Sequence, residues 1–231
     1  MLSPQVQMKD WSIRGIGPTD YRQWILKKHY AKRVPQVQHA FGLFDEALSM
    51  QGVCTFGSPC RVMNNGECVF DGKYPVLTFE LNRLCVNDML PKNALSWFVG
   101  QCLRALPKPC CVVSYADANN GHHGYIYQAT NWVYTGITAP ELKYFNTRTS
   151  EELHPRTVVE MFGSRSINAL PDWIERSKEA GGKYRYFQFL GDRRQIAAMR
   201  KALVYPVEPY PKGVNERYDA SFIPMTQCNL F

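Results

Sequence analysis

Several features that would assign a chain to a familiar class are missing here. There is no CxxC pair and no Cys/His group at zinc-finger spacing, which argues against the common zinc domains. The N-terminus lacks the apolar core of a signal peptide, and no apolar run approaches the length of a membrane span. We find no internal repeat or low-complexity tract. We therefore expect a cytoplasmic protein that contacts no membrane and keeps its thiols reduced.

The chain does have enough apolar material for one large domain. Of its 231 residues, 45% are hydrophobic and 13% aromatic, which suffices for a sizeable core. Charged residues make up 20%, a share that does not indicate wholesale disorder. We expect a single domain over residues 1–231. Several of the eight cysteines, such as Cys85, lie in apolar stretches and are expected to be buried thiols.

The charge balance is basic. Lys and Arg outnumber Asp and Glu by 27 to 20, a formal net charge of +7. Long-range attraction to a polyanion such as nucleic acid fits this balance. Many basic proteins bind no nucleic acid, so charge alone leaves both alternatives open.

Apolar periodicity predicts a mixed succession of strands and helices. Alternation over Tyr74–Val86 favours a long strand, and the apolar run Cys110–Tyr115 is typical of a buried one. Helical spacing of apolar residues predicts a helix over Ala94–Leu106. Further strands are expected at Trp11–Ile16, Val37–Glu46, Gly52–Phe56, Val133–Gly136, Glu141–Thr149 and Tyr184–Leu190, and helices at Tyr21–Lys32, His122–Asn131, Leu170–Ala180 and Asp192–Leu203. This order predicts an α/β fold with helices on both faces of the sheet.

The stretch from Ser114 to Trp132 is rich in groups that can do chemistry. A buried strand ends near Ser114, and a polar turn with Asp117 and Asn119 leads into the next helix. Sheet proteins place ligands where strand ends face helix starts, whose free amides add partial positive charge. Tyr127 is placed to donate a proton. The alternative is that Asp117 or Asn119 only caps a helix.

The same stretch carries a resemblance. From Ser114 through Asn119 to Trp132 it resembles the fifth strand and fourth helix of the GNAT acyltransferase fold, whose mixed sheet is mostly antiparallel. More narrowly, the chain resembles the Mom family of phage DNA-modification proteins over about residues 20–212. The matching motifs are His29-Tyr30, Leu81-Asn-Arg83-Leu, Pro91-Lys-Asn93-Ala-Leu-Ser96-Trp-Phe, Ser114-Tyr-Ala-Asp117, Gly121-His122-x-Gly124, Tyr184-Arg185-Tyr186 and Pro209-Tyr-Pro211-Lys.

The resemblance implies a function. Mom-like proteins convert N6 of adenine in double-stranded DNA to a carbamoylmethyl derivative, which protects phage DNA from host restriction in the host cytoplasm. By motif, the implied catalytic residues are His29, Tyr30, Arg83, Ser114, Asp117 and Tyr127. To these we add candidate substrate-binding residues: Asn93, Ser96, Tyr115, Asn119 and His122.

Each candidate has a structural alternative. His29 is expected to act as a base or metal ligand, although a lone histidine on a helix is more often structural. Arg83 can hold a phosphate or carboxylate bidentately or form a surface ion pair. Ser114 can hydrogen-bond a donor carbonyl; without a GxSxG elbow it is not expected to be a nucleophile. Tyr30, Tyr115 and Trp132 are candidates for stacking an extruded adenine, or for core packing.

The donor and any metal stay open at this point. GNAT proteins bind the pyrophosphate of coenzyme A with a glycine-rich loop after the fourth strand, and the corresponding segment 87–93 has no glycine. Coenzyme A is therefore doubtful, and a small acyl or glycyl donor is expected. His29, Tyr30, Asp117 and His122 are of ligand types that suit iron.

Basic side chains at two places are candidate contacts to DNA phosphates. They are Lys27, Lys28, Lys32 and Arg33 after the first helix, and Arg193, Arg194, Arg200 and Lys201 on the last. Each can instead be a solvated surface charge. Two rival functions remain: an ordinary acetyl-coenzyme A N-acyltransferase acting on a small amine or a protein, and a non-catalytic nucleic-acid-binding protein.

Overall fold

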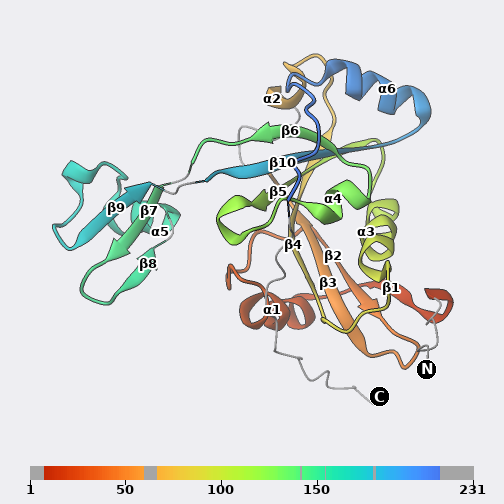
Figure 1. Ribbon diagram of the computed structural model, residues 1–231, viewed down its shortest axis with the longest axis horizontal. Helices are drawn as coiled ribbons and strands as arrows, with labels where there is room; N and C mark the ends of the chain where they lie inside the picture. The colour runs from red at the N-terminus through yellow and green to blue at the C-terminus, as the bar shows by residue number, and fades with distance from the viewer. Residues whose placement is uncertain (1–7, 60–66, 141, 154, 179–180, 214–231) are drawn as a thin grey trace.

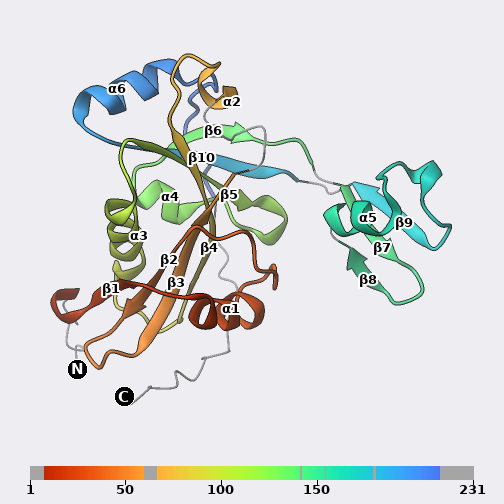
Figure 2. The same cartoon turned by 180° about the vertical axis from the view of Figure 1, so that it is seen from behind.

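The computed structural model describes residues 8–59, 67–140, 142–153, 155–178 and 181–213 (Figures 1 and 2). Its main body is a seven-stranded sheet in the order β1-β2-β3-β4-β5-β10-β6. These strands are β1 Ser12–Gly15, β2 His39–Phe44, β3 Met50–Gly57, β4 Leu77–Val86, β5 Cys110–Asp117, β6 Val133–Ile137 and β10 Lys183–Leu190. The helices are α1 Pro18–Lys27, α2 Glu67–Phe70, α3 Ala94–Ala105, α4 Tyr125–Ala129, α5 Pro155–Phe162 and α6 Arg193–Ala202. No helix in the described ranges is long and apolar enough to span a membrane.

Helices cover both faces of this sheet because side chains alternate along its strands. Val112 of β5 packs with α3, whereas its neighbour Val113 points to the opposite face and packs with α2 and α6. In the same way Cys54 of β3 faces α3, and Val53 faces Trp24 of α1. The expected mixed α/β sheet with helices on both faces is confirmed.

The pairing of β4 and β5 creates the opening in which the candidate site lies. Every other neighbouring pair in this sheet is antiparallel, but β4 and β5 run parallel and are paired only from Leu77↔Cys110 to Glu80↔Val113. Both strands continue past that last pair, through residues 81–86 and 114–117, and part from each other. We call the space between these two half-strands the fork.

A bulge in β4 changes which side chains face the fork. Thr55 of β3 is opposite Arg83 and Phe56 is opposite Leu81, so Asn82 is an extra residue on β4. Its amide is held in place: Oδ1 accepts from Thr55 Oγ1 at 2.7 Å, and Nδ2 donates to the Gln36 carbonyl at 3.0 Å. The extra residue puts Glu80 and Arg83 on the same face, although positions three apart in a regular strand face opposite ways.

A second, three-stranded sheet projects from the edge of the main body (Figure 1). It has the order β8-β7-β9, with β7 Leu142–Asn146, β8 Glu151–Leu153 and β9 Ile174–Lys178. With α5 it has its own small core of Tyr144, Val158, Leu170 and Ile174. The chain enters this unit after β6 and leaves it before β10, two neighbours in the main sheet. The strand expected at Glu141–Thr149 corresponds to β7, but β8 and β9 were not expected.

Two expected helices are wrong in type or extent. In place of a helix over residues 170–180 the structure has β9, which pairs with β7 from Asn146↔Ile174 to Leu142↔Lys178. The charged sequence Ile-Glu-Arg-Ser-Lys suits a helix, but pairing with β7 overrides that weak preference. The helix expected over residues 122–131 is reduced to α4, because Gly121 (φ 67°) and Gly124 (φ 83°) are both in the left-handed region that ends helices.

Candidate active site

The fork opens into a cavity of about 780 Å³. The end of α1, β4, the β4–α3 connection, β5 and the segment around α4 all contribute to its wall. Nine of the eleven residues proposed for catalysis or substrate binding line it: His29, Tyr30, Arg83, Asn93, Ser96, Tyr115, Asp117, His122 and Tyr127. Residues from separate parts of the chain thus meet at one place. Ser114 and Asn119 do not line the cavity.

Ser114 is buried behind the cavity wall, with 1% of its surface exposed. Its Oγ donates to the Leu81 carbonyl at 2.8 Å and lies 2.7 Å from the Tyr127 hydroxyl. A serine hydroxyl has one proton and a carbonyl can only accept, so Tyr127 must donate to Ser114. Contact of Ser114 with a donor carbonyl is therefore a wrong expectation: its proton is already used.

Removing this hydroxyl should destabilise the protein as well as the site. In Ser114→Ala, the Leu81 carbonyl and the Tyr127 hydroxyl lose a buried partner, which costs about 1–3 kcal/mol. We expect a lower midpoint in urea unfolding and normal solubility. A variant as stable as the parent would show that water replaces the hydroxyl.

Tyr127 is almost fully buried between aromatic rings. Its ring centroid is 5.0 Å from that of Trp132 and 5.1 Å from that of Tyr186. Burial raises the pKa of Tyr127, and the bond with Ser114 opposes this only in part. Tyr127 therefore stays protonated and serves as a hydrogen-bond donor. Trp132 is 0% exposed, so of the two alternatives for its ring, core packing is the one observed.

His29 and Tyr30 lie just past the end of α1, which stops at Lys27 and not at Lys32 as expected. The centroids of the His29 and Tyr30 rings are 4.3 Å apart. The His122 ring packs edge-to-face with Tyr30, with a centroid distance of 5.7 Å. The Ala31 amide donates to His29 Nδ1 at 3.1 Å, so the neutral imidazole has its proton on Nε2. In this arrangement His29 offers an N–H donor, and neither nitrogen has a free lone pair.

Burial, assisted by Arg83 and His122, lowers the pKa of His29 from 6.5 to about 3. An unfolded chain takes up this proton below about pH 6.5 and the folded one does not, so stability falls as pH drops through that window. The loss is about 1.4 kcal/mol per pH unit. His29→Asn keeps a side-chain acceptor for the Ala31 amide and does not titrate. Urea unfolding at several pH values should show a flatter acid dependence for the variant; parallel curves would contradict the assignment.

Arg83 is fixed by backbone carbonyls and retains further donors. Its Nη1 donates to the Asn82 carbonyl at 2.5 Å and its Nε to the Arg33 carbonyl at 3.2 Å. Burial lowers the pKa of the guanidinium, while Tyr30 and Glu80 favour the charged form. No described acidic side chain forms an ion pair with it. Of the two alternatives for Arg83, the surface ion pair is not observed among the described residues, and the geometry suits an anionic ligand.

Asp117 and Asn119 have structural duties. Asp117 Oδ1 accepts from the Asn119 amide at 3.0 Å and caps the 3-10 helix Ala118–Asn120, while the residue still lines the cavity. The side chain of Asn119 exchanges hydrogen bonds with the backbone of Gly181. These bonds give Asn119 a structural role next to β10, and substrate binding by Asn119 stays a prediction.

The residues proposed to bind DNA do not form one surface. Lys28 is 2% exposed, and its Nζ donates to Asn87 Oδ1 at 2.9 Å, so it is not available at the surface. Burial lowers its pKa, against an opposing effect of Asp88. The exposed Lys27, Lys32 and Arg33 flank the cavity residues His29 and Tyr30 in the sequence, whereas α6, with the exposed Arg193, Arg194, Arg200 and Lys201, lies toward the opposite edge of the main sheet (Figures 1 and 2).

The hypothesised iron site gains no support from the arrangement. Within the described ranges, no three His, Cys, Asp or Glu side chains are close enough together to hold a metal ion. Nδ1 of His29 is also occupied by an amide proton. We therefore assign no step to a metal.

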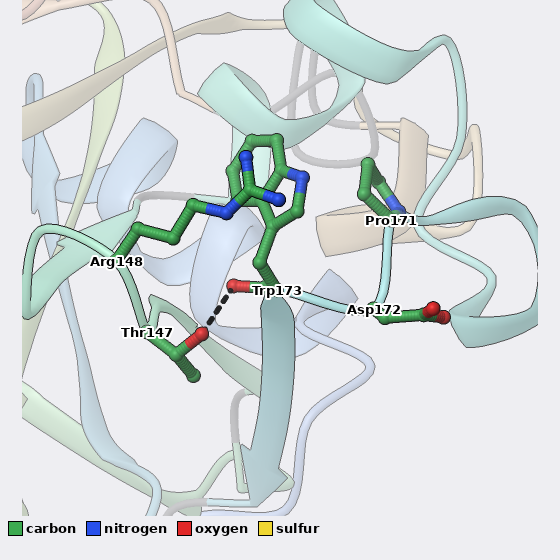
Figure 3. Close-up of a pocket in the computed structure, with 5 residues that line it drawn as sticks. All are labelled: Thr147, Arg148, Pro171, Asp172 and Trp173. Carbon is green, nitrogen blue, oxygen red and sulfur yellow. Dashed lines mark hydrogen bonds between the residues drawn. The ribbon is translucent and has the colours of Figure 1, made fainter.

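A second hollow, of about 560 Å³, lies on the small sheet (Figure 3). It is formed by residues 147, 148 and 171–173, with the guanidinium of Arg148 5.1 Å above the ring of Trp173. Thr147 Oγ1 donates to the Trp173 carbonyl at 3.1 Å. None of the residues proposed from the sequence lies there, and it gathers no acid, base and nucleophile, so the fork is the better candidate.

Sequence reasoning missed some cavity residues. Asn87, Asp88 and Lys92, in the connection between β4 and α3, also line the cavity. Polar side chains directly after a long strand are a signal that would have found them, since ligands gather at such strand ends.

With this geometry in hand, comparison with known proteins decides the family. The Mom protein family model matches residues 10–212. The chain belongs to the Mom family. It is 27% identical over 203 residues to the methylcarbamoylase Mom of Escherichia phage Mu, covering 83% of this chain and 79% of the relative. Among solved structures it is similar to spermidine N-acetyltransferase from Vibrio cholerae in complex with CoA and spermine, with a TM-score of 0.45 and 8% identity, over 81% of this chain and 98% of the other.

Proposed function

We propose that this protein transfers a small group to N6 of adenine in double-stranded DNA, forming the carbamoylmethyl derivative and protecting phage DNA from host restriction. Membership of the Mom family and the similarity to the methylcarbamoylase of phage Mu support this proposal. The observation that carries it is the fork: one cavity gathers nine of the eleven residues proposed from the sequence for catalysis or substrate binding. Its volume of about 780 Å³ is in the usual range for small-molecule sites.

The chemistry requires positioning more than strong bases. The exocyclic amine of adenine is a weak nucleophile because its lone pair is delocalised into the ring, so amine and donor must be held together. The base must also leave the duplex to be reached. Tyr30 and Tyr115 offer half-buried rings at the cavity for stacking. Arg83 supplies positive charge, and His29 an N–H donor, for an anionic group or a polarised carbonyl.

We propose a small acyl or glycyl donor in place of coenzyme A. Segment 87–93 has no glycine, and Asn93 (φ 66°) at the start of α3 has a side chain where close approach of a pyrophosphate would favour none. A glycyl group has the same atoms as a carbamoylmethyl group, so one donor can supply both carbons and the nitrogen. Glycyl transfer to N6 forms an N6–carbonyl bond, so an isomerisation that replaces it with an N6–CH2 bond must follow and leave the glycyl nitrogen as the terminal amide. In cells fed glycine labelled in carbon and nitrogen, the modified nucleoside should carry both labels together. A label in carbon alone would indicate an acetyl donor with a separate nitrogen source.

The test of the proposal is chemical analysis of DNA. We expect bacteria that express the protein to contain a modified deoxyadenosine, detected by mass spectrometry after digestion of the DNA to nucleosides. Cells expressing an equally soluble Arg83→Gln variant should contain little or none. An unmodified profile with soluble wild-type protein would contradict the proposal and favour an acyltransferase for another amine or a non-catalytic DNA-binding protein.

Binding to DNA should depend on the exposed basic residues that flank His29 and Tyr30 in the sequence. If Lys27, Lys32 and Arg33 neutralise phosphates, duplex affinity falls steeply with salt, and each charge removed reduces the slope of log affinity against log salt by roughly one. The matched double variant Arg193→Gln/Arg194→Gln on α6 should leave the slope unchanged. Fluorescence anisotropy between low and physiological salt measures this, and a flat dependence for the wild type would contradict DNA as substrate.

A further inference from the structure

His123 is a histidine in the cavity wall that the chemistry above does not use. The residue is 9% exposed, and no described residue makes a hydrogen bond to either nitrogen of its ring. A neutral imidazole has one N–H donor and one nitrogen lone pair. A side chain of this kind, nine-tenths buried in the wall of a cavity and without a hydrogen-bond partner from the described protein, is a candidate for contact with a ligand.

The backbone of His123 is held in place, and this leaves its ring nitrogens unused. The His123 carbonyl accepts hydrogen bonds from the Tyr186 hydroxyl at 2.5 Å and from Gln128 Nε2 at 3.2 Å. A Cβ built on Gly213 would lie 3.6 Å from both Nδ1 and Cε1 of the His123 ring. Gly213 also lines the cavity, so this edge of the imidazole lies next to a second residue of the wall.

Transfer to adenine needs a proton acceptor, because N6 has two protons and loses one when it gains the new bond. Tyr127 keeps its proton, since burial raises its pKa. His29 has no lone pair to offer, because Nδ1 accepts from the Ala31 amide and Nε2 holds the proton. One oxygen of Asp117 caps a 3-10 helix. His123 has a lone pair that no described residue engages.

We propose that the imidazole of His123 is the general base that takes a proton from N6 of the extruded adenine. N6 forms a bond to the electrophilic carbon of the acyl or glycyl donor. The bond from that carbon to its leaving group breaks, and the electron pair goes to the leaving group. One N6 proton passes to the imidazole, which becomes an imidazolium and then gives the proton to the leaving group. This inference rests on the proposed function and names the residue that removes the proton.

Two amide variants retain hydrogen-bonding groups at this position but cannot take up the proton: His123→Gln and His123→Asn. Both should unfold at about the wild-type urea concentration. Both should bind a duplex with adenine opposite an abasic site as the wild type does, measured by fluorescence anisotropy. Modified deoxyadenosine, measured by mass spectrometry while the wild-type signal still rises linearly after induction, should fall roughly 100-fold or more, the usual contribution of a general base.

His39→Gln is the matched control for the loss of an imidazole. His39 is a half-buried histidine on β2 that packs edge-on against Phe79 and does not line the cavity. This variant should modify DNA as the wild type does. Asp117→Asn tests the competing acceptor, because Asn keeps an oxygen for the cap of the 3-10 helix but is not a base.

Wild-type modification by soluble His123→Gln or His123→Asn would overturn the inference. A loss of modification no larger than the loss of duplex affinity would do the same, because His123 would then act in binding or folding alone. Loss in Asp117→Asn combined with full activity of His123→Gln would assign the proton to Asp117. Absence of modified deoxyadenosine with the wild type would count against the proposed function instead, so the two failures are distinguishable.

Discussion

Gly124→Ala should lower both stability and DNA modification sharply. Gly124 is in the left-handed region at φ 83°, and a Cβ there would lie 2.4 Å from the ring of the fully buried Tyr186. The Tyr186 hydroxyl also donates to the neighbouring His123 carbonyl at 2.5 Å, so the ring has little freedom to move. Strain and overpacking together cost about 2–5 kcal/mol. Because α4 begins at the next residue, Tyr127 should be displaced from Ser114, and modification should fall with stability.

A matched control separates steric clash from backbone strain. Gly72 has a similar φ of 65°, but nothing lies within 4 Å of a Cβ built there. Gly72→Ala should cost only about 1–2 kcal/mol and leave modification unchanged. Urea unfolding and nucleoside mass spectrometry on both variants measure the difference. Equal destabilisation of the two would show that the Tyr186 ring moves aside without cost.

Arg83→Gln should reduce modification by roughly 100-fold or more, the usual effect of losing a donor aimed at developing charge. Gln cannot keep both bonds to the Asn82 and Arg33 carbonyls and still present a cation to the cavity. We expect Arg83→Lys to recover little, because a lysine ammonium lacks the planar fork of donors. Modified deoxyadenosine per total deoxyadenosine, at equal soluble protein, measures the loss.

The control for Arg83 is Arg22→Gln on the exposed side of α1, which removes the same charge at a residue that does not line the cavity. It should modify DNA as the wild type does. Full activity of a soluble Arg83→Gln would mean that the guanidinium only braces the loop at Arg33, and the site would need another cation.

Local sequence patterns predicted the strands and helices of the main sheet well. β4, β5, β10 and α3 lie within two or three residues of their expected bounds, because alternating or helical spacing there coincides with burial. In the small sheet, β7 was expected but β9 was not, for a physical reason: β9 has one buried residue, Ile174, so its strand character comes from pairing with β7 and not from an apolar face. Non-local pairing leaves no periodic trace in the sequence.

The candidate site was predicted in composition but not in detail. The motifs proposed His29, Arg83, Asp117 and Tyr127, and all four line one cavity. Ser114, proposed from the same motifs, is instead a buried hydrogen-bond link between Tyr127 and the Leu81 carbonyl. No sequence pattern shows where the pairing of β4 with β5 ends. Just past its last pair, the Leu81 carbonyl accepts a hydrogen bond from the Ser114 hydroxyl.

Photo-crosslinking is the measurement that bears most directly on the fork as the place where adenine is bound. A duplex with a single 8-azidoadenine opposite an abasic site would be irradiated with the protein and the attached peptide identified by mass spectrometry. We predict attachment within β4, β5 or the segment around Tyr30, and its loss on competition with an unmodified adenine duplex. Attachment confined to α6 or to the hollow around Trp173 would contradict the assignment of the fork as the adenine site.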